Sequence, residues 1–314
     1  MMQFVNRARL YRVLLGSLSA LLPALQAAAD TTAEVSVNLA RREDNLNWNI
    51  AGNSVNVLSE LTWKKLAITQ VSFDTLVNFP NRMRLSSQLG YGLINSGLNQ
   101  DSDYDGNDRT QEFSRSSNKS GGNLVDASIG LGKTFEVWRS QGGIKVDLIP
   151  IAGLSIHQQN LTMKDGVQTI SASSTSPPLG PIAGLNSSYK AQWMGPWWGL
   201  DTQWETARGL SLNVAIEYHL VDFSAKADWN LRTDFAHPVS YTHQAGGEGL
   251  VVGICALYAV NERWTMKLKM ERQRWKAHAG TDVVFLRNGT TEYARLNEVN
   301  WDSSAASIGL TRRF

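Results

Sequence analysis

An acidic segment between residues 101 and 112 has the residue types and spacing that suit a calcium ion. Oxygen-bearing residues recur at alternate positions, namely Asp101, Asp103, Asp105 and Asn107, and the pattern closes at Glu112. This spacing matches a twelve-residue calcium loop, in which the Asn107 carbonyl adds a ligand, Glu112 binds through both oxygens and Gly106 permits the sharp turn. The flanking residues are strand-like or rich in Ser, Asn and Gly rather than helical. The alternative is therefore a solvated acidic loop without a metal.

The overall composition narrows the classes of function. The chain has 314 residues, with 30 Lys and Arg, 28 Asp and Glu, five His and one Cys. A single Cys excludes an internal disulfide and a zinc site built from several thiolates. A net charge of +2 offers no concentrated basic face, so no nucleic-acid partner is expected. Charged residues make up 18% of the chain, below the ~25% of an ordinary soluble domain.

The first 29 residues are predicted to be a cleaved secretory signal peptide. Arg7, Arg9 and Arg12 give a basic start, residues 13–22 are largely apolar, and three alanines at 27–29 suit cleavage. The apolar run is about half the ~20 residues that a spanning helix needs, which disfavours a membrane anchor. Residues 30–314 are then expected to form a single domain.

Apolar and polar residues alternate with a period of two along much of that domain. The apolar positions that we expect to face lipid include Leu212, Val214, Ile216, Trp264, Met266 and Leu268. Such alternation indicates strands with one apolar and one polar face. The alternating stretches continue for about 15–20 residues, longer than the ~5–6 of typical soluble strands.

Short and long polar connections separate these stretches in strict alternation. Short joints fall near residues 78–82, 137–143, 206–209 and 260–263, and long loops near 43–53, 99–122, 164–187, 230–241 and 279–297. Short periplasmic turns and long external loops are typical of outer-membrane barrels. The tryptophans near strand ends are expected to form interfacial girdles, namely Trp48, Trp63, Trp138, Trp193, Trp197, Trp204, Trp229 and Trp264. The sequence thus predicts an all-β fold, a ten-stranded antiparallel transmembrane β-barrel surrounded by lipid of the bacterial outer membrane.

Several islands of the sequence resemble the omptins, a family of ten-stranded outer-membrane endopeptidases. The similar stretches are Leu58-Ser-Glu-Leu-Thr-Trp63-Lys64, Phe73-Asp74, 97–105, Tyr189-Lys190, Trp193, Pro196-Trp197, Gly199-Leu200, Gly309-Leu310 and Phe314. The resemblance runs over most of residues 30–314 and implies the same barrel, with activity to be tested residue by residue.

The resemblance also implies where a proteolytic site would lie. Omptins hold a water molecule between an Asp-x-Asp pair and an Asp-x-His pair, whose His acts as the base. The first pair matches Asp101 and Asp103. Counting from Tyr218, the second pair matches Asp228 and Asn230. Because an amide has no nitrogen that titrates near neutral pH, Asn230 cannot accept the proton.

A second histidine lies in the same predicted loop. His237, in Asp234-Phe-Ala-His237-Pro238, is a candidate for a relocated base, and its alternative is an ordinary loop residue beside a turn proline. The catalytic residues of an active enzyme would then be Asp101, Asp103, Asp228 and His237.

Three functions from different classes remain open. The preferred hypothesis is a binding or surface protein with a degraded protease site, whose acidic extracellular cleft takes cations, cationic peptides or another protein surface. The second is an active omptin-type endopeptidase that cleaves near basic residues. The third is a pore, which is disfavoured because inward side chains fill a ten-stranded lumen. Calcium and a hydrolytic water compete as occupants of the acidic pair, since one carboxylate cannot serve both.

Overall fold

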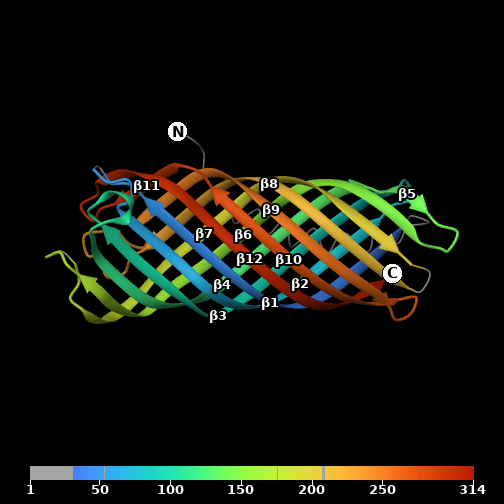
Figure 1. Ribbon diagram of the computed structural model, residues 1–314, viewed down its shortest axis with the longest axis horizontal. Coiled ribbons are helices and arrows are strands. Elements are labelled where there is room, and N and C mark those ends of the chain that lie inside the picture. Colours follow the sequence, from blue (N-terminus) through green and yellow to red (C-terminus); the bar gives the residue numbers. More distant parts are fainter. Residues whose placement is uncertain (1–30, 53, 175, 207–208) are drawn as a thin grey trace.

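The structure, a computed structural model, describes residues 31–52, 54–174, 176–206 and 209–314. These residues form one antiparallel wall of long strands (Figure 1). The strands are β1 Thr32–Ile50, β2 Ser59–Asn78, β3 Met83–Tyr104, β4 Glu112–Lys133, β6 Lys145–Ser171, β7 Gly180–Glu205, β8 Leu210–Asp228, β9 Tyr241–Ala259, β10 Trp264–Ala277 and β12 Thr291–Arg313. Each pairs with the next and β12 pairs with β1, which closes the wall and confirms the predicted ten-stranded barrel. The predicted signal peptide lies outside the described residues.

Two further short strands lengthen the wall at its ends but do not change the number of strands around the barrel. β5 (Phe135–Arg139) pairs with β6 and extends the β4–β6 hairpin beyond the short-turn end, at the right of Figure 1. β11 (Gly280–Phe285) pairs with both β9 and β12, as β10 does. It therefore lies in line with β10 and extends it at the opposite end of the barrel. No helix in the described part of the chain is long and apolar enough to cross a membrane.

The strands run further into the polar segments than the sequence predicted. β3 and β4 extend to Tyr104 and from Glu112, so most of the predicted loop 99–122 is strand. β6 and β7 likewise shorten the loop 164–187, and β11 occupies part of 279–297. These predictions were wrong because a strand that projects beyond the lipid has water on its outer face. Its outward residues can then be polar without breaking the pairing.

The outer face carries an apolar belt over the middle and the short-turn half of the barrel. Ile216 on β8 is 49% exposed, and Met266 and Leu268 on β10 are exposed as well. Their cross-strand neighbours, such as Leu200 and Val252 beside Ile216, are also exposed and apolar. A continuous belt of this kind is the surface that a barrel presents to lipid, so the predicted lipid-facing positions are confirmed.

The half of the barrel toward the long loops, opposite the short-turn end, has its interior filled by an apolar core. Its largest members are aromatic: Trp48, Trp63, Tyr189, Trp193, Phe223, Trp275 and Trp301. Four tryptophans expected in the interfacial girdles, Trp48, Trp63, Trp193 and Trp197, are instead buried inside the barrel, and Trp229 packs against the core. Trp138, Trp204 and Trp264 are exposed. Alternation gives the period of a strand but does not say which face meets lipid when both faces carry apolar residues.

Below this core, the half of the barrel inside the lipid belt encloses a polar cavity of about 240 Å³. Its lining includes the charged and titratable side chains of Glu217, His219, Lys267, Lys269 and Glu271. Lys269 pairs with Glu271 at 2.5 Å, and Lys267 pairs with Asp74 at the same distance. These two lysines are thus paired with carboxylates, as burial in an interior of low polarity requires.

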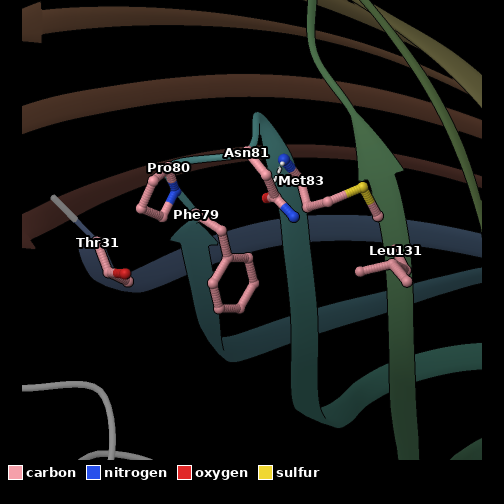
Figure 2. Close-up of a pocket in the computed structure, with 6 residues that line it drawn as sticks. All are labelled: Thr31, Phe79, Pro80, Asn81, Met83 and Leu131. Atoms are coloured by element: carbon pink, nitrogen blue, oxygen red, sulfur yellow. Dashed lines mark hydrogen bonds between the residues drawn. The ribbon is translucent and has the colours of Figure 1, made fainter. Parts of the chain in front are cut away.

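An apolar hollow lies at the short-turn end, beside the turn between β2 and β3 (Figure 2). The turn is closed by the Arg82 amide, which donates to the Phe79 carbonyl at 3.0 Å, and by the Met83 amide, which donates to Asn81 Oδ1 at 3.1 Å. The side chains of Phe79, Met83 and Leu131 line the hollow. It lies at the opposite end of β3 from Asp101 and Asp103, so it is separate from the acidic site.

Candidate functional site

Asp101 and Asp103 lie near the end of β3, on the face that points into the barrel. Asp101 pairs across the sheet with Leu61, a core residue that is 1% exposed. Directly paired residues of antiparallel strands share a face, and residues two apart on one strand do too. Both carboxylates therefore point inward at the extracellular mouth. The two carboxylates therefore lie side by side on the inner face of β3.

The surroundings of this acidic pair disfavour two negative charges. Burial raises the pKa of Asp101, and the neighbouring Asp103 raises it further. Burial also raises the pKa of Asp103, although its strand neighbours Ser59 and Ser114 hydrogen-bond its carboxylate and oppose the rise. Trp229 donates a hydrogen bond to Asp101. The pair is thus an acidic site whose charge is incompletely compensated.

Arg232 supplies positive charge near the pair. It lies in the loop between β8 and β9, and its guanidinium lowers the pKa of both Asp101 and Asp103. The guanidinium also binds Asp234 through two hydrogen bonds of 2.9 and 2.7 Å. The Arg232 side chain is 52% exposed, so its charge is shared between the site, Asp234 and solvent.

Asp228 and His237 form a second pair, on the outer face of the wall. His237 Nδ1 lies 2.5 Å from Asp228 Oδ1, and this contact raises the pKa of His237. Ala225 and Ala227 on β8 are buried in the core, so Asp228 belongs to the outward-facing series of that strand. The four candidate catalytic residues, Asp101, Asp103, Asp228 and the proposed relocated base His237, therefore lie as two pairs on opposite faces of the wall.

Asn230, the residue at the matched histidine position, has a structural role. Its Oδ1 accepts hydrogen bonds from the Asn186 amide at 2.9 Å and from Ser187 Oγ at 3.0 Å. Its Nδ2 donates to the Gly184 carbonyl at 2.8 Å. The side chain thereby ties the β8–β9 loop to the segment that opens β7, and both of its polar atoms are used in doing so.

The predicted calcium ligands are not gathered around one point. Asp101 and Asp103 point into the barrel, whereas Asp105 is exposed. Glu112 is held by both hydrogen bonds of Arg115, and Asn107 begins a short 3-10 helix, η2 (Asn107–Arg109). Among the described residues, no group of three or more His, Cys, Asp or Glu side chains could hold a metal ion. Calcium binding stays a prediction, and it requires Glu112 to leave Arg115.

A third titratable cluster, which the sequence did not reveal, lies inside the core. His243 on β9 is paired in register with Asp282 on β11, and both are 1% exposed. His243 Nδ1 lies 3.0 Å from the Tyr189 hydroxyl, and His243 Nε2 lies 3.2 Å from Asp282 Oδ1. Burial, together with Tyr189, Asp101 and Asp282, raises the pKa of Tyr241 beside them. The cluster is enclosed. His243 Nδ1 shares a hydrogen bond with Tyr189, whereas His243 Nε2 and Asp282 Oδ1, although close together, have no hydrogen-bond partner in the described part of the chain.

Comparison with known proteins gives the family. Residues 36–314 match the family model described as "Pom: Protochlamydia outer membrane protein". The chain belongs to this family. Its barrel is similar to that of the outer membrane protease OmpT from Escherichia coli, with a TM-score of 0.70 and 14% identity over 92% of this chain and 99% of that chain. The omptin-like barrel and its location in the bacterial outer membrane, both predicted from the sequence, are confirmed.

Other solved barrels are less similar. The translocator domain of the autotransporter NalP from Neisseria meningitidis has a TM-score of 0.38 and 11% identity, covering 98% of each chain. OprG from Pseudomonas aeruginosa has a TM-score of 0.31 and 9% identity, covering 91% of this chain and 96% of that chain. No curated protein sequence matches the chain. At 14% identity, the likeness to OmpT shows the fold alone.

Proposed function

We propose that this outer-membrane barrel binds cationic side chains of peptides or proteins at its acidic extracellular mouth and does not cleave them. The observation that carries the proposal is the inward-facing pair of Asp101 and Asp103, neither of which has an ion pair within 4.0 Å among the described residues. Burial raises the pKa of both carboxyl groups, so their ionised forms lack a compensating positive charge in contact. A guanidinium or ammonium group placed between the two carboxylates would remove their repulsion.

Two features argue for binding rather than hydrolysis. A general base must lie within hydrogen-bond reach of the proton that it removes. His237 is on the outer face with Asp228, and the enclosed His243 is hydrogen-bonded to Tyr189 inside the core. In the described part of the chain, neither histidine has a hydrogen bond or an ion pair with Asp101 or Asp103. The endopeptidase alternative requires one of them to move.

The test is fluorescence anisotropy of a labelled peptide with two adjacent arginines, titrated with detergent-refolded barrel. A charged hydrogen bond contributes about 1.5–3 kcal/mol, so Asp101→Asn combined with Asp103→Asn should weaken binding at least about tenfold. Asp222→Asn is the matched control, because Asp222 is an exposed carboxylate on the outer face of β8. It should bind like the wild type.

A parallel incubation followed by mass spectrometry examines cleavage. We expect the peptide to stay intact. Unchanged affinity in the double variant would refute the binding proposal. Cleavage that disappears in the same variant would instead establish the endopeptidase.

A further inference from the structure

The apolar hollow beside the β2–β3 turn opens on the outer face of the barrel. On β3, Met83 is an even number of residues from Tyr91, which is exposed in the lipid belt. On β4, Leu131 is exposed and lies two residues from Ile129, which is exposed as well. Residues separated by an even number along a strand point to the same face. The hollow therefore faces lipid rather than the polar cavity inside the barrel.

The hollow lies where the lipid belt ends. β5, which follows β4 directly, carries the exposed aromatic side chains of Phe135 and Trp138. Aromatic side chains of this kind gather where the hydrocarbon meets water, and the short turns of outer-membrane barrels are periplasmic. The hollow is thus at the level where the acyl chains of the periplasmic leaflet join their headgroups.

The hollow has the size and the lining of a site for a hydrocarbon chain. Its volume is about 500 Å³, within the ~300–1,000 Å³ of small-molecule sites. Most of its walls are apolar, formed by Phe79, Pro80, Met83 and Leu131. Figure 2 shows Met83 reaching from β3 toward β4, which carries Leu131. A chain in this hollow would contact the protein on several sides, whereas a chain lying flat against the belt contacts it on one.

A lysine lies at the edge of the hollow. Lys133 is paired in register with Met83 and is two residues from Leu131, so it shares their outward face. Lys133 Nζ lies 5.8 Å from the centroid of the Phe135 ring, which is further toward the short-turn end. The ammonium group is therefore turned from the hydrocarbon toward the headgroups, as in lysines that snorkel at a membrane surface.

An arginine lies on the adjoining turn. Arg82 directly precedes Met83, and its carbonyl accepts a hydrogen bond of 2.9 Å from the amide of the residue after Lys133. Arg82 and Lys133 are both exposed, and neither has an ion pair in the described part of the chain. The carboxylate of Glu136 on the next strand is already held by Arg139 through hydrogen bonds of 2.7 and 2.6 Å. Two cations without a protein counter-ion thus lie beside the apolar hollow.

We propose that this hollow binds one acidic phospholipid of the periplasmic leaflet, with an acyl chain in the hollow and the phosphate at Lys133 and Arg82. Ammonium and guanidinium groups both bind phosphate, and two of them favour a headgroup with a net negative charge over a zwitterionic one. The site is at the opposite end of the barrel from the acidic mouth, so it is independent of the proposed peptide binding.

Native mass spectrometry of the detergent-refolded barrel measures this binding, with phosphatidylglycerol or phosphatidylcholine of the same acyl chains added at increasing concentration. We expect one saturable phosphatidylglycerol adduct and phosphatidylcholine binding at least about fivefold weaker, the effect of about one cation near a lipid surface. Lys133→Gln combined with Arg82→Gln should weaken the phosphatidylglycerol adduct about tenfold or more. Arg263→Gln is the matched control and should change nothing, because Arg263 is an exposed cation on another short turn, between β9 and β10.

A second substitution examines the hollow itself. Met83→Trp places a larger side chain in the space that the acyl chain would fill, and we expect the saturable adduct to be lost. Met266→Trp is its control, because Met266 is exposed in the lipid belt on β10, away from the hollow. Heat-modified mobility in gels checks that each barrel is folded.

Both kinds of variant must weaken the adduct if the site is as proposed. Equal binding of the two lipids, or retained affinity in the Lys133 and Arg82 double variant, would show lipid bound without regard to charge and would overturn the proposal. Retained affinity in Met83→Trp would overturn it as well, because the acyl chain would then lie outside the hollow.

Discussion

A charge placed on the lipid belt is the sharpest perturbation of the barrel topology. Ile216 is 49% exposed and lies between Leu200 and Val252 on neighbouring strands, which are exposed to 40% each. The apolar series on β8 extends from Leu210 to Leu220, so Ile216 lies close to the middle of the belt. Arginine at the bilayer midplane costs about 2–4 kcal/mol of folding free energy. We therefore expect Ile216→Arg to destabilise the barrel by about that amount.

The same substitution higher on the same face provides the control. Ser224 is also outward-facing on β8, between the polar neighbours Gln192 and Gln244. The eight residues that separate it from Ile216 correspond to roughly 26 Å along the strand, at ~3.3 Å per residue. Even with a strand tilt of about 40°, this distance takes Ser224 out of the hydrocarbon. Ser224→Arg should cost no more than about 1 kcal/mol, the value near the interfaces.

Reversible urea unfolding of the two variants in lipid vesicles measures both costs against the wild type. The comparison is internal, because the inserted side chain, the strand and the face are the same. Equal free energies of unfolding for Ile216→Arg and Ser224→Arg would refute the assignment of the belt, and so would a near-zero cost at Ile216.

Three further predictions concern the extracellular end. Asn230→His should not create peptide cleavage, because this position is turned toward the segment before β7; peptide fragments in mass spectra would contradict that placement. Calcium should bind residues 101–112 with a Kd of ~10⁻⁴–10⁻³ M in isothermal titration. Asp103→Asn with Glu112→Gln should abolish this heat, and identical heats would show a solvated loop. The contact with Asp228 raises the pKa of His237 above the ordinary histidine value of ~6.5. The ion pair is therefore fully formed below pH ~6.5, and it is lost as the pH rises through the raised pKa of His237. Hydrogen exchange of residues 229–240, corrected for its intrinsic pH dependence, should therefore accelerate at high pH, and a His237→Gln variant that keeps this dependence would contradict the assignment.

The barrel was predictable because period-two alternation is a direct consequence of strand geometry. Ile216, Met266 and Leu268 were placed on the lipid side from this pattern alone, and the structure confirms them. The side of Trp48 and Trp63 was predicted wrongly. Both lie in strand segments that project beyond the lipid, where the interior is apolar and the exterior is in water. This is the reverse of the membrane-spanning part of a barrel, whose outer face is apolar and whose interior is polar.

The candidate site was predictable from the sequence in one part only. Asp101 and Asp103 are two apart on one strand and had to share a face, so their pairing followed from the sequence. Near Asp228 the alternation was ambiguous, since Ala225 and Ala227 are small residues that suit either face, and the structure buries them inward.

The pair of His243 and Asp282 was beyond sequence reasoning for a different reason. The two residues belong to separate strands, and only the register between β9 and β11 brings them together. Register depends on turn lengths and on the packing of the whole interior. No local pattern around either residue carries that information.

The central claim is that the inward carboxylates of Asp101 and Asp103 bind the cationic side chain of a ligand. A crystal structure of the barrel with a short arginine peptide tests it most directly. We predict a peptide guanidinium within hydrogen-bond distance of both carboxylates and an intact peptide backbone. A peptide bound elsewhere on the barrel, with no contact to Asp101 or Asp103, would contradict the claim.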